Sequence, residues 1–361
     1  MKQLVLLGAG RAHLHLLKHH AELSRHGVLP PRITLLAPQA RPVQPGMLAG
    51  FVAGRYALEQ CSVALDALVG ATPVRWLTSP VRSLDATAGR FILDDGAELD
   101  YDWLSVDLPA VQDRQHAEST MPGARAHGLF VRPLEHFCGL WPRVVELAQT
   151  RTLRLSVVGG GTTGIELALA LRHRLRQAPV SLVTGAQGLA PRQPPALRGK
   201  AAELLRARGV TVLPDRVSAI GPDELKLESG ARLACDVALM ATPAQAPTWL
   251  QASGLALDAQ ARLAVDACLR SDSHRNVFAC GETCGGAAGT GQGRYGRSSG
   301  PTLLHNLGAA LAGREPRPLT PARRELHLLS ASQGTALACW GELCVQGRWV
   351  DSVKDRLDRP G

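Results

Sequence analysis

The stretch of sequence best suited to chemistry is a glycine-rich run within residues 153–168. Gly159, Gly161 and Gly164 have the spacing GxGxxG, in which the glycines allow a tight turn, a close phosphate and a helix packed against its strand. A buried strand is expected at 153–158 and a helix at 162–177, which is the context that the motif requires. We therefore predict that a nucleotide pyrophosphate binds at this helix N-terminus, the alternative being an ordinary strand-to-helix turn.

A second copy of this pattern opens the chain. An apolar strand leads into Gly8 and Gly10, and a helix follows from Arg11. The third glycine is replaced by His13, which we expect to push the helix slightly away from the strand. Two such loops in one chain predict two dinucleotide-binding units. Two nucleotides imply electron transfer between them, with a flavin in the first unit and a nicotinamide in the second.

Length and composition agree with a cytoplasmic α/β protein of two or three domains. The chain has 361 residues, 45% of them hydrophobic, and a mean hydropathy of -0.01. No apolar run reaches the roughly 20 residues of a membrane span, and we expect no signal peptide. The net charge of +9 comes from scattered arginines, which argues against nucleic acid as a partner and favours an anionic cofactor or an anionic membrane face.

Elements between the two loops follow from local patterns. Strands are expected at 32–37, 74–78, 81–84 and 101–107, with a hairpin turning at Asp95 and Gly96. The loop at 41–54 leads into a short helix, and we place Pro45, Gly46 and Met47 beside a flavin ring, the alternative being a surface loop. Residues 110–128 are interpreted as a linker. A helix is expected at 134–149, with Pro142 kinking it or starting a second helix.

No acidic residue follows the second strand of either unit, where one would normally hold the adenosine ribose. Ala37 and Pro38 stand there in the first unit, and Thr184 and Gly185 in the second. The choice between NADH and NADPH is therefore open, with Arg192 near enough to be considered for a 2′-phosphate.

The chain then returns to the first unit. A buried strand at 276–282 carries Gly281 and the acid Glu282 at its end, where a carboxylate can bond a ribityl chain. A helix begins near Pro301 and Thr302, and its N-terminus would stabilise the charge of a reduced flavin. Three short strands, at 325–330, 334–340 and 343–350, and a final helix from Asp351 complete the chain.

The sequence resembles the pyridine nucleotide-disulfide oxidoreductase superfamily over nearly its whole length. It is most similar to the branch related to type II NADH dehydrogenases and sulfide:quinone oxidoreductases that is often fused to selenide, water dikinase. The residues that carry the resemblance are Gly8-Ala-Gly10, the Pro-Gly-Met-Leu loop at 45–48, and the segments 101–105, 159–166, 277–282 and 349–358.

This resemblance implies FAD, NADH or NADPH, and an acceptor that is a quinone or another small molecule. It implies a FAD-binding domain at 1–118 and 243–318, an NAD(P)-binding domain inserted at 119–242, and a C-terminal α+β interface segment at 319–361, for dimerisation or membrane docking. The resemblance assigns to cofactor binding Gly8, Gly10, His13, Gly159, Gly161, Gly164, Glu166 and Glu282. From the local patterns we add Arg11, Pro45, Gly46, Met47, Thr162, Thr163, Gly281, Pro301 and Thr302.

Three departures from the family pattern are visible. Val106-Asp-Leu-Pro109 and Ala241-Thr-Pro243 stand where an Ala-Thr-Gly turn is usual, and Glu282 replaces an aspartate. Proline lacks both the amide donor and the freedom of glycine, so we expect altered turns. A non-catalytic flavoprotein or partner subunit is therefore an alternative function.

The cysteines decide the chemical subtype. Cys339 and Cys344 have the CxxxxC spacing of disulfide reductases, but they lie outside both units and we attribute the spacing to chance. Cys280 and Cys284 flank Glu282, and as catalytic residues they would give a sulfide- or selenide-oxidising enzyme in which the thiolate of Cys284 attacks the substrate. The alternative is that a buried strand end needs small residues. We expect most cysteines to be free thiols and expect no metal site.

Overall fold

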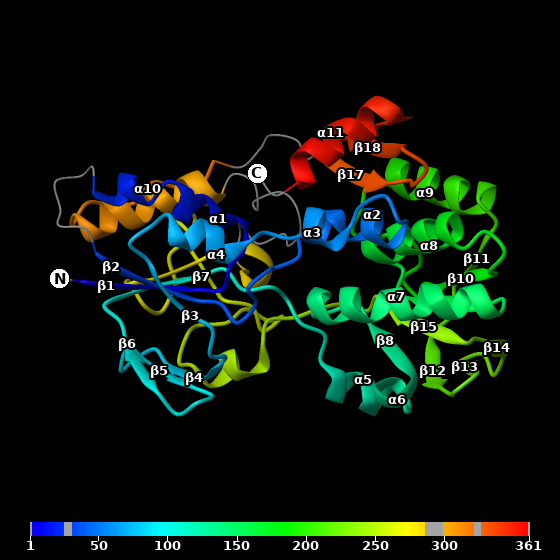
Figure 1. Ribbon diagram of the computed structural model, residues 1–361, viewed down its shortest axis with the longest axis horizontal. Helices are drawn as coiled ribbons and strands as arrows, with labels where there is room; N and C mark the ends of the chain where they lie inside the picture. The colour runs from blue at the N-terminus through cyan, green and yellow to red at the C-terminus, as the bar shows by residue number, and fades with distance from the viewer. Residues whose placement is uncertain (1, 25–30, 286–298, 321–325, 360–361) are drawn as a thin grey trace. The chain divides into compact units, whose positions relative to one another are not determined.

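The computed structural model describes residues 2–24, 31–285, 299–320 and 326–359 (Figure 1). The chain forms two compact units, each made from separate pieces of sequence. The first unit comprises residues 1–42, 64–111 and 245–323, and the second comprises 43–63, 112–244 and 324–361. The C-terminal segment and the loop around Gly46 therefore belong to the second unit.

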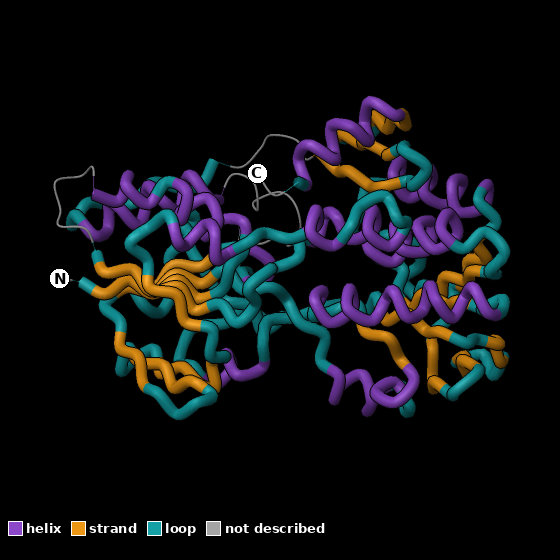
Figure 2. Tube along the Cα trace, in the orientation of Figure 1, coloured by secondary structure: helices purple, strands orange, loops and turns teal. Residues whose placement is uncertain are grey.

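The first unit is built on a parallel sheet of five strands (Figure 2). Their order is β16 (Val277–Ala279), β7 (Trp103–Val106), β1 (Gln3–Leu7), β2 (Arg32–Leu36) and β3 (Arg75–Leu77). Figure 1 shows α1 (Arg11–Lys18), α4 (Leu65–Gly70) and α10 (Ser299–Leu311) on one side of this sheet. The small antiparallel sheet of β4 (Val81–Asp85), β5 (Arg90–Leu93) and β6 (Glu98–Asp100) lies on the other side.

The second unit repeats the same plan. Its parallel sheet has the order β11 (Val210–Leu213), β10 (Val180–Val183), β9 (Leu155–Val158), β15 (Val237–Met240) and β8 (Gly128–Phe130). The helices α7 (Leu134–Thr150), α8 (Thr162–Arg174) and α9 (Pro195–Ala207) accompany it, with a small antiparallel sheet of β12 (Val217–Ile220), β13 (Glu224–Leu227) and β14 (Arg232–Ala234). In both units the glycine loop follows the central strand, and the α/β fold class is confirmed.

The C-terminal part of the second unit is an antiparallel sheet with a helix packed on it. The sheet consists of β17 (Leu326–Ser330), β18 (Ala336–Trp340) and β19 (Leu343–Gly347), and α11 (Arg348–Asp358) follows. The predicted strands and helix are confirmed, although α11 begins three residues earlier than expected and Glu325 lies outside the described residues. One face of α11 is buried, whereas Trp349, Val353 and Leu357, spaced four residues apart, are exposed.

One expectation about local structure was wrong, and one alternative is excluded. Residues 110–128 are not a linker, because α5 (Arg114–Thr120) and α6 (Ala124–His127) lie within them. The carboxylate of Asp113 accepts hydrogen bonds from the amides of Gln115 and His116, so a cap sets the start of α5 in a polar segment without apolar periodicity. Of the two alternatives for Pro142, a second helix is excluded, since α7 continues through this residue.

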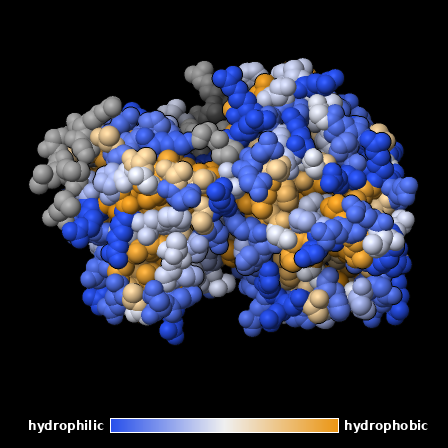
Figure 3. Space-filling model, in the orientation of Figure 1, coloured by the Kyte–Doolittle hydropathy of each residue, from blue (hydrophilic) through white to orange (hydrophobic). Residues whose placement is uncertain are grey.

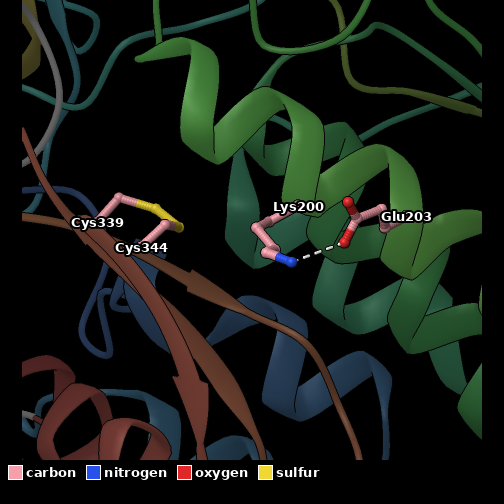
Figure 4. Close-up of a disulfide and its surroundings, with 4 residues drawn as sticks. All are labelled: Lys200, Glu203, Cys339 and Cys344. Carbon is pink, nitrogen blue, oxygen red and sulfur yellow. Dashed lines mark hydrogen bonds and ion pairs between the residues drawn. A yellow bond between two sulfur atoms is a disulfide. The ribbon is translucent and has the colours of Figure 1, made fainter. Parts of the chain in front are cut away.

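Cys339 and Cys344 form a disulfide (Figure 4). They are directly opposite each other on β18 and β19, with Cα atoms 4.1 Å apart. Our attribution of this spacing to chance was therefore wrong, because a short hairpin turn brings the two residues together. The other six cysteines are free thiols.

No helix among the described residues combines the length and the apolar character needed to cross a bilayer. The visible face of the molecule is mainly hydrophilic, with smaller apolar areas between the polar ones (Figure 3).

Candidate functional site

The second glycine loop has an open backbone surface at the start of α8. A Cβ atom on Gly159 would lie 2.3 Å from the carbonyl oxygen of Ala241, and one on Gly164 would lie 1.9 Å from the carbonyl oxygen of Gly159. These two glycines therefore permit close backbone contacts that no other residue allows. A Cβ on Gly161 would meet nothing within 4 Å, and no side chain caps α8. The loop and the first turn, with Thr162 and Thr163, fit a bound phosphate.

The first loop has a similar backbone arrangement, but the side chain of Asp107 fills the space that is open in the second loop. A Cβ on Gly8 would lie 2.4 Å from the carbonyl oxygen of Asp107, which repeats the close approach made by Gly159. A Cβ on Gly10, however, would collide with the carboxyl group of Asp107. One oxygen of this carboxyl group accepts hydrogen bonds from the amides of Ala12 (2.9 Å) and His13 (3.2 Å). The side chain of Asp107 thus caps α1, which begins at Arg11.

His13 is fully buried between α1 and the sheet. Its Nδ1 lies 2.6 Å from the carbonyl oxygen of Gly8, and its Nε2 lies 2.8 Å from the hydroxyl oxygen of Ser105. Burial lowers the pKa of His13 to about 4, against the effect of the Gly8 carbonyl. The ring is therefore neutral, donating from Nδ1 to Gly8 and accepting from Ser105. Its role is to join the loop to β7, where the second unit has a glycine.

The turn after β16 lies against Asp107 in the same unit. Gly281 has a φ of +80°, and a Cβ there would lie 2.3 Å from a carboxyl oxygen of Asp107. Glu282 accepts a hydrogen bond of 3.1 Å from the amide of Ala110. The first loop and the turn at Gly281 and Glu282 thus both lie against the segment around Asp107.

Pro301 and Thr302 lie in the first turns of α10, in the same unit. The hydroxyl groups of Thr283 and Ser299 are buried without a hydrogen-bond partner among the described residues. Buried polar groups are normally satisfied, so these hydroxyls are available to a bound cofactor.

Both candidate catalytic cysteines are buried thiols. Cys280 lies 3.8 Å from the carbonyl oxygen of Val106, and Cys284 lies 3.6 Å from that of Ala279. Burial raises the pKa of Cys284 to about 12 and that of Cys280 well above its ordinary value. A thiol rather than a thiolate is present at neutral pH, and a thiol is a poor nucleophile.

A buried ionic cluster joins the second loop to the end of the chain. Glu166 on α8 accepts a hydrogen bond of 2.6 Å from the amide of Ser330 and lies 3.6 Å from the ammonium group of Lys354 on α11. Lys354 also bonds to Asp358 (2.6 Å) and to the carbonyl oxygen of Gly46 (3.1 Å). The side chain of Glu166 therefore points to this cluster.

The cluster keeps one cation among two carboxylates. Burial alone would lower the pKa of Lys354, but Glu166 and Asp358 outweigh it and the pKa is raised. Burial raises the pKa of Glu166, against the opposing effects of Lys354 and the Ser330 amide. The two carboxylates therefore keep Lys354 protonated at neutral pH.

A recess of about 430 Å³ lies beside this cluster in the second unit. The predicted loop residues Gly46 and Met47 line it, and Pro45 begins the short 3₁₀ helix that leads to them. Arg55 and Tyr56 contact Asp351 and Asp355 of α11 at its edge. Its volume is in the range of small-molecule sites.

Asp107, Lys354 and Asp358 were not assigned a role from the sequence. Asp107 directly follows a buried strand, a position from which a side chain can reach a neighbouring loop. From the sequence we considered only the proline of that turn, Pro109. Lys354 and Asp358 are four residues apart and so share one face of α11. This spacing can be seen in the sequence, but the burial of the two side chains cannot.

Each unit has a parallel sheet with a glycine loop after its central strand. This arrangement is that of an oxidoreductase that binds two dinucleotides. The chain belongs to the pyridine nucleotide-disulphide oxidoreductase family, whose sequence model matches residues 2–306. The family uses FAD and NAD(P)H, the two cofactors that the loops predict, and the chain is an oxidoreductase of this family.

Relatives agree with this assignment. The chain is 25% identical to the demethylphylloquinone reductase NdbB of Synechocystis, over 89% of this chain and 82% of that protein. Its fold is similar to that of the sulfide:quinone oxidoreductase of Aquifex aeolicus, with a TM-score of 0.78, 16% identity, and 99% and 90% of the two chains covered. It is also similar to NDH2 of Plasmodium falciparum in complex with NADH, with a TM-score of 0.73, 13% identity, and 99% and 97% covered.

Proposed function

We propose that this protein is a NAD(P)H:quinone oxidoreductase. FAD, when bound, would supply the hydride-accepting group between NAD(P)H and the quinone. NAD(P)H would bind at Gly159, Gly161 and the first turn of α8, and FAD at the first loop and the turn around Glu282. The curated relative that reduces a quinone supports this acceptor class.

The observation that carries the acceptor proposal is the buried cluster of Glu166, Lys354 and Asp358. Reduction of a quinone to a quinol takes up two protons with its two electrons. The ammonium group of Lys354, which its two carboxylate partners keep protonated, lies beside a recess of small-molecule size. We propose that the ammonium group of Lys354 donates one proton to the reduced quinone and is then reprotonated from solvent, which also supplies the second proton. Glu166 and Asp358 hold the ammonium group in place.

The location in the cell follows as part of the same proposal. We propose a cytoplasmic protein that meets its quinone at a membrane face, because a net charge of +9 attracts it to anionic surfaces. Turnover with a quinone held in anionic vesicles should then exceed turnover with the same quinone in neutral vesicles. Equal rates would contradict this part of the proposal.

The test begins with the visible spectrum of the purified protein. Bound flavin that is bleached anaerobically by NADH or NADPH, and restored by a short-chain quinone, is the expected result. The absence of a flavin band would instead support the non-catalytic alternative. The buried thiols of Cys280 and Cys284 do not favour the sulfide-oxidising alternative, and no bleaching by sulfide is expected.

A pair of lysine variants tests the proton donor. Lys354→Gln should lower quinone-dependent kcat by about 100-fold or more, with bleaching by NAD(P)H retained. Lys200→Gln is the matched control, because Lys200 pairs with Glu203 on the exposed surface of α9 (Figure 4). Equal turnover in the two variants would remove Lys354 from the proposal.

A further inference from the structure

Asp107 and Ala241 are counterparts in the two units. Asp107 follows β7 and its amide donates to the carbonyl oxygen of Leu7 at 2.9 Å, while Ala241 follows β15 and its amide donates to that of Val158 at 2.9 Å. The carbonyl oxygen of each lies against the first glycine of its own loop, Gly8 or Gly159. The internal repeat therefore allows a direct comparison of the two positions.

The two loops differ in what this residue presents to the helix N-terminus. Ala241 has no side chain to extend beyond its Cβ, and the space beside Gly161 is open. The carboxyl group of Asp107 fills the equivalent space beside Gly10 and holds the amides of Ala12 and His13. The first loop thus carries a carboxyl group of its own where the second loop is open.

An ionised Asp107 and a pyrophosphate compete for the same end of α1. Each is stabilised by the amides there, and two like charges in a buried site repel each other strongly. We propose that FAD binds to the first loop only when the carboxyl group of Asp107 is protonated, so that binding takes up one proton. This inference depends on the proposed use of FAD by the first unit.

The groups around Asp107 favour the protonated form of its carboxyl group. His13 faces it from α1, and Cys280, Glu282 and Cys284 face it from β16 and the following turn. His13 is neutral, both cysteines are thiols, and Glu282 adds negative charge, so none of these four supplies a cation. Burial, together with Glu282, raises the pKa of Asp107 to about 7, against the opposing amides of His13 and Ala12.

The sign of the pH dependence follows from linkage. A bound pyrophosphate raises the pKa of Asp107 further, so FAD binds more tightly to the protonated protein. Below about pH 7 the proton is already present and affinity changes little. Above about pH 7 the Kd for FAD rises about tenfold per pH unit, because each binding event takes up one proton.

The experiment is a titration of the flavin-free full-length protein with FAD between pH 5.5 and 8.5, followed by flavin fluorescence. Calorimetry at pH 8 in two buffers with different ionisation enthalpies counts the protons. Wild type should show the tenfold slope and an uptake of about one proton. Asp107→Asn, and Asp107→Ala, which copies the second loop, should bind with a Kd that changes less than about twofold over the same range.

The reciprocal variant tests the idea without altering the first loop. Ala241→Asp introduces a carboxyl group beside Gly161, and NADH binding should become weaker and should weaken further as pH rises. The inference is overturned if wild type shows no slope and no proton uptake, if Asp107→Asn keeps the wild-type slope, or if Ala241→Asp leaves NADH binding unchanged at pH 8. The first two outcomes leave the proposed function intact, whereas failure of FAD to bind at any pH overturns both.

Discussion

The carboxylate of Glu166 lies 3.6 Å from the ammonium group of Lys354 in the interior of the second unit. Glu166 is on the helix that follows the glycine loop, and Lys354 is on the last helix of the chain. The ion pair therefore connects the predicted nucleotide loop with the C-terminal sheet and helix. The C-terminal segment is part of the second unit for this reason as well as through its apolar packing.

Loss of Lys354 should destabilise the second unit. Lys354→Met would leave Glu166 and Asp358 buried without their cation, at a cost of about 3–5 kcal/mol in the free energy of unfolding at pH 7. Urea denaturation followed by circular dichroism measures this change. Lys200→Met, which removes an exposed ion pair with Glu203, should cost less than about 1 kcal/mol. Similar costs for the two variants would contradict the assignment of a buried cluster.

The stability of the flavin-free protein should depend on Asp107. Its pKa rises from an ordinary 3.8 to about 7 on folding, so the folded state holds its proton more tightly than the unfolded state. The stability that this group contributes is greatest below about pH 4, falls as pH rises and is lost above about pH 7. The total change is about 4 kcal/mol.

Asp107→Asn should therefore flatten the decline in urea midpoint between pH 5 and pH 8. Asp113→Asn is the matched control, because Asp113 caps α5 at the surface with the same pair of amide contacts. A decline that survives in Asp107→Asn would show that another group is responsible.

Replacing Gly161 or Gly164 of the second loop with alanine should have different effects on stability and on NADH binding. Gly161→Ala meets no atom within 4 Å, so the protein should fold with a stability within about 0.5 kcal/mol of wild type. Its added methyl group enters the space where phosphate would bind, and the Kd for NADH should rise at least tenfold. Gly164→Ala would collide with the carbonyl oxygen of Gly159 and should cost about 1–3 kcal/mol. Calorimetric NADH titrations and urea midpoints separate the two effects, and normal NADH binding by Gly161→Ala would argue against this loop as the site.

The Cys339–Cys344 bond should be detectable and modestly stabilising. Intact-protein mass spectrometry before and after reduction should show a gain of two hydrogens, with no change in Cys339→Ser. Because the closed loop is short, the disulfide should contribute about 2 kcal/mol. Cys268→Ser, at a half-buried free thiol, serves as the control. An unchanged mass on reduction of the wild type would contradict the pairing.

Local pattern was sufficient to locate both loops. Gly159, Gly161 and Gly164, and Gly8 with Gly10, were recognised from spacing and from the apolar strands before them, because these features depend on residues adjacent in sequence. The alternation of strands and helices also determined the fold class. His13 was correctly identified as the departure in the first loop, although its contact with Ser105 was not predictable.

Tertiary structure decided which distant residues meet. The carboxyl group of Asp107 reaches Gly10 because β7 pairs with β1, and Lys354 reaches Glu166 because α11 packs against the second unit. Burial also decided the chemistry of Cys280 and Cys284, since the same residues at a surface would have ordinary pKa values. Sequence by itself determined the loops, the cofactor classes and the fold. Long-range packing determined where the charges lie, because desolvation and ion pairing depend on neighbours far along the chain.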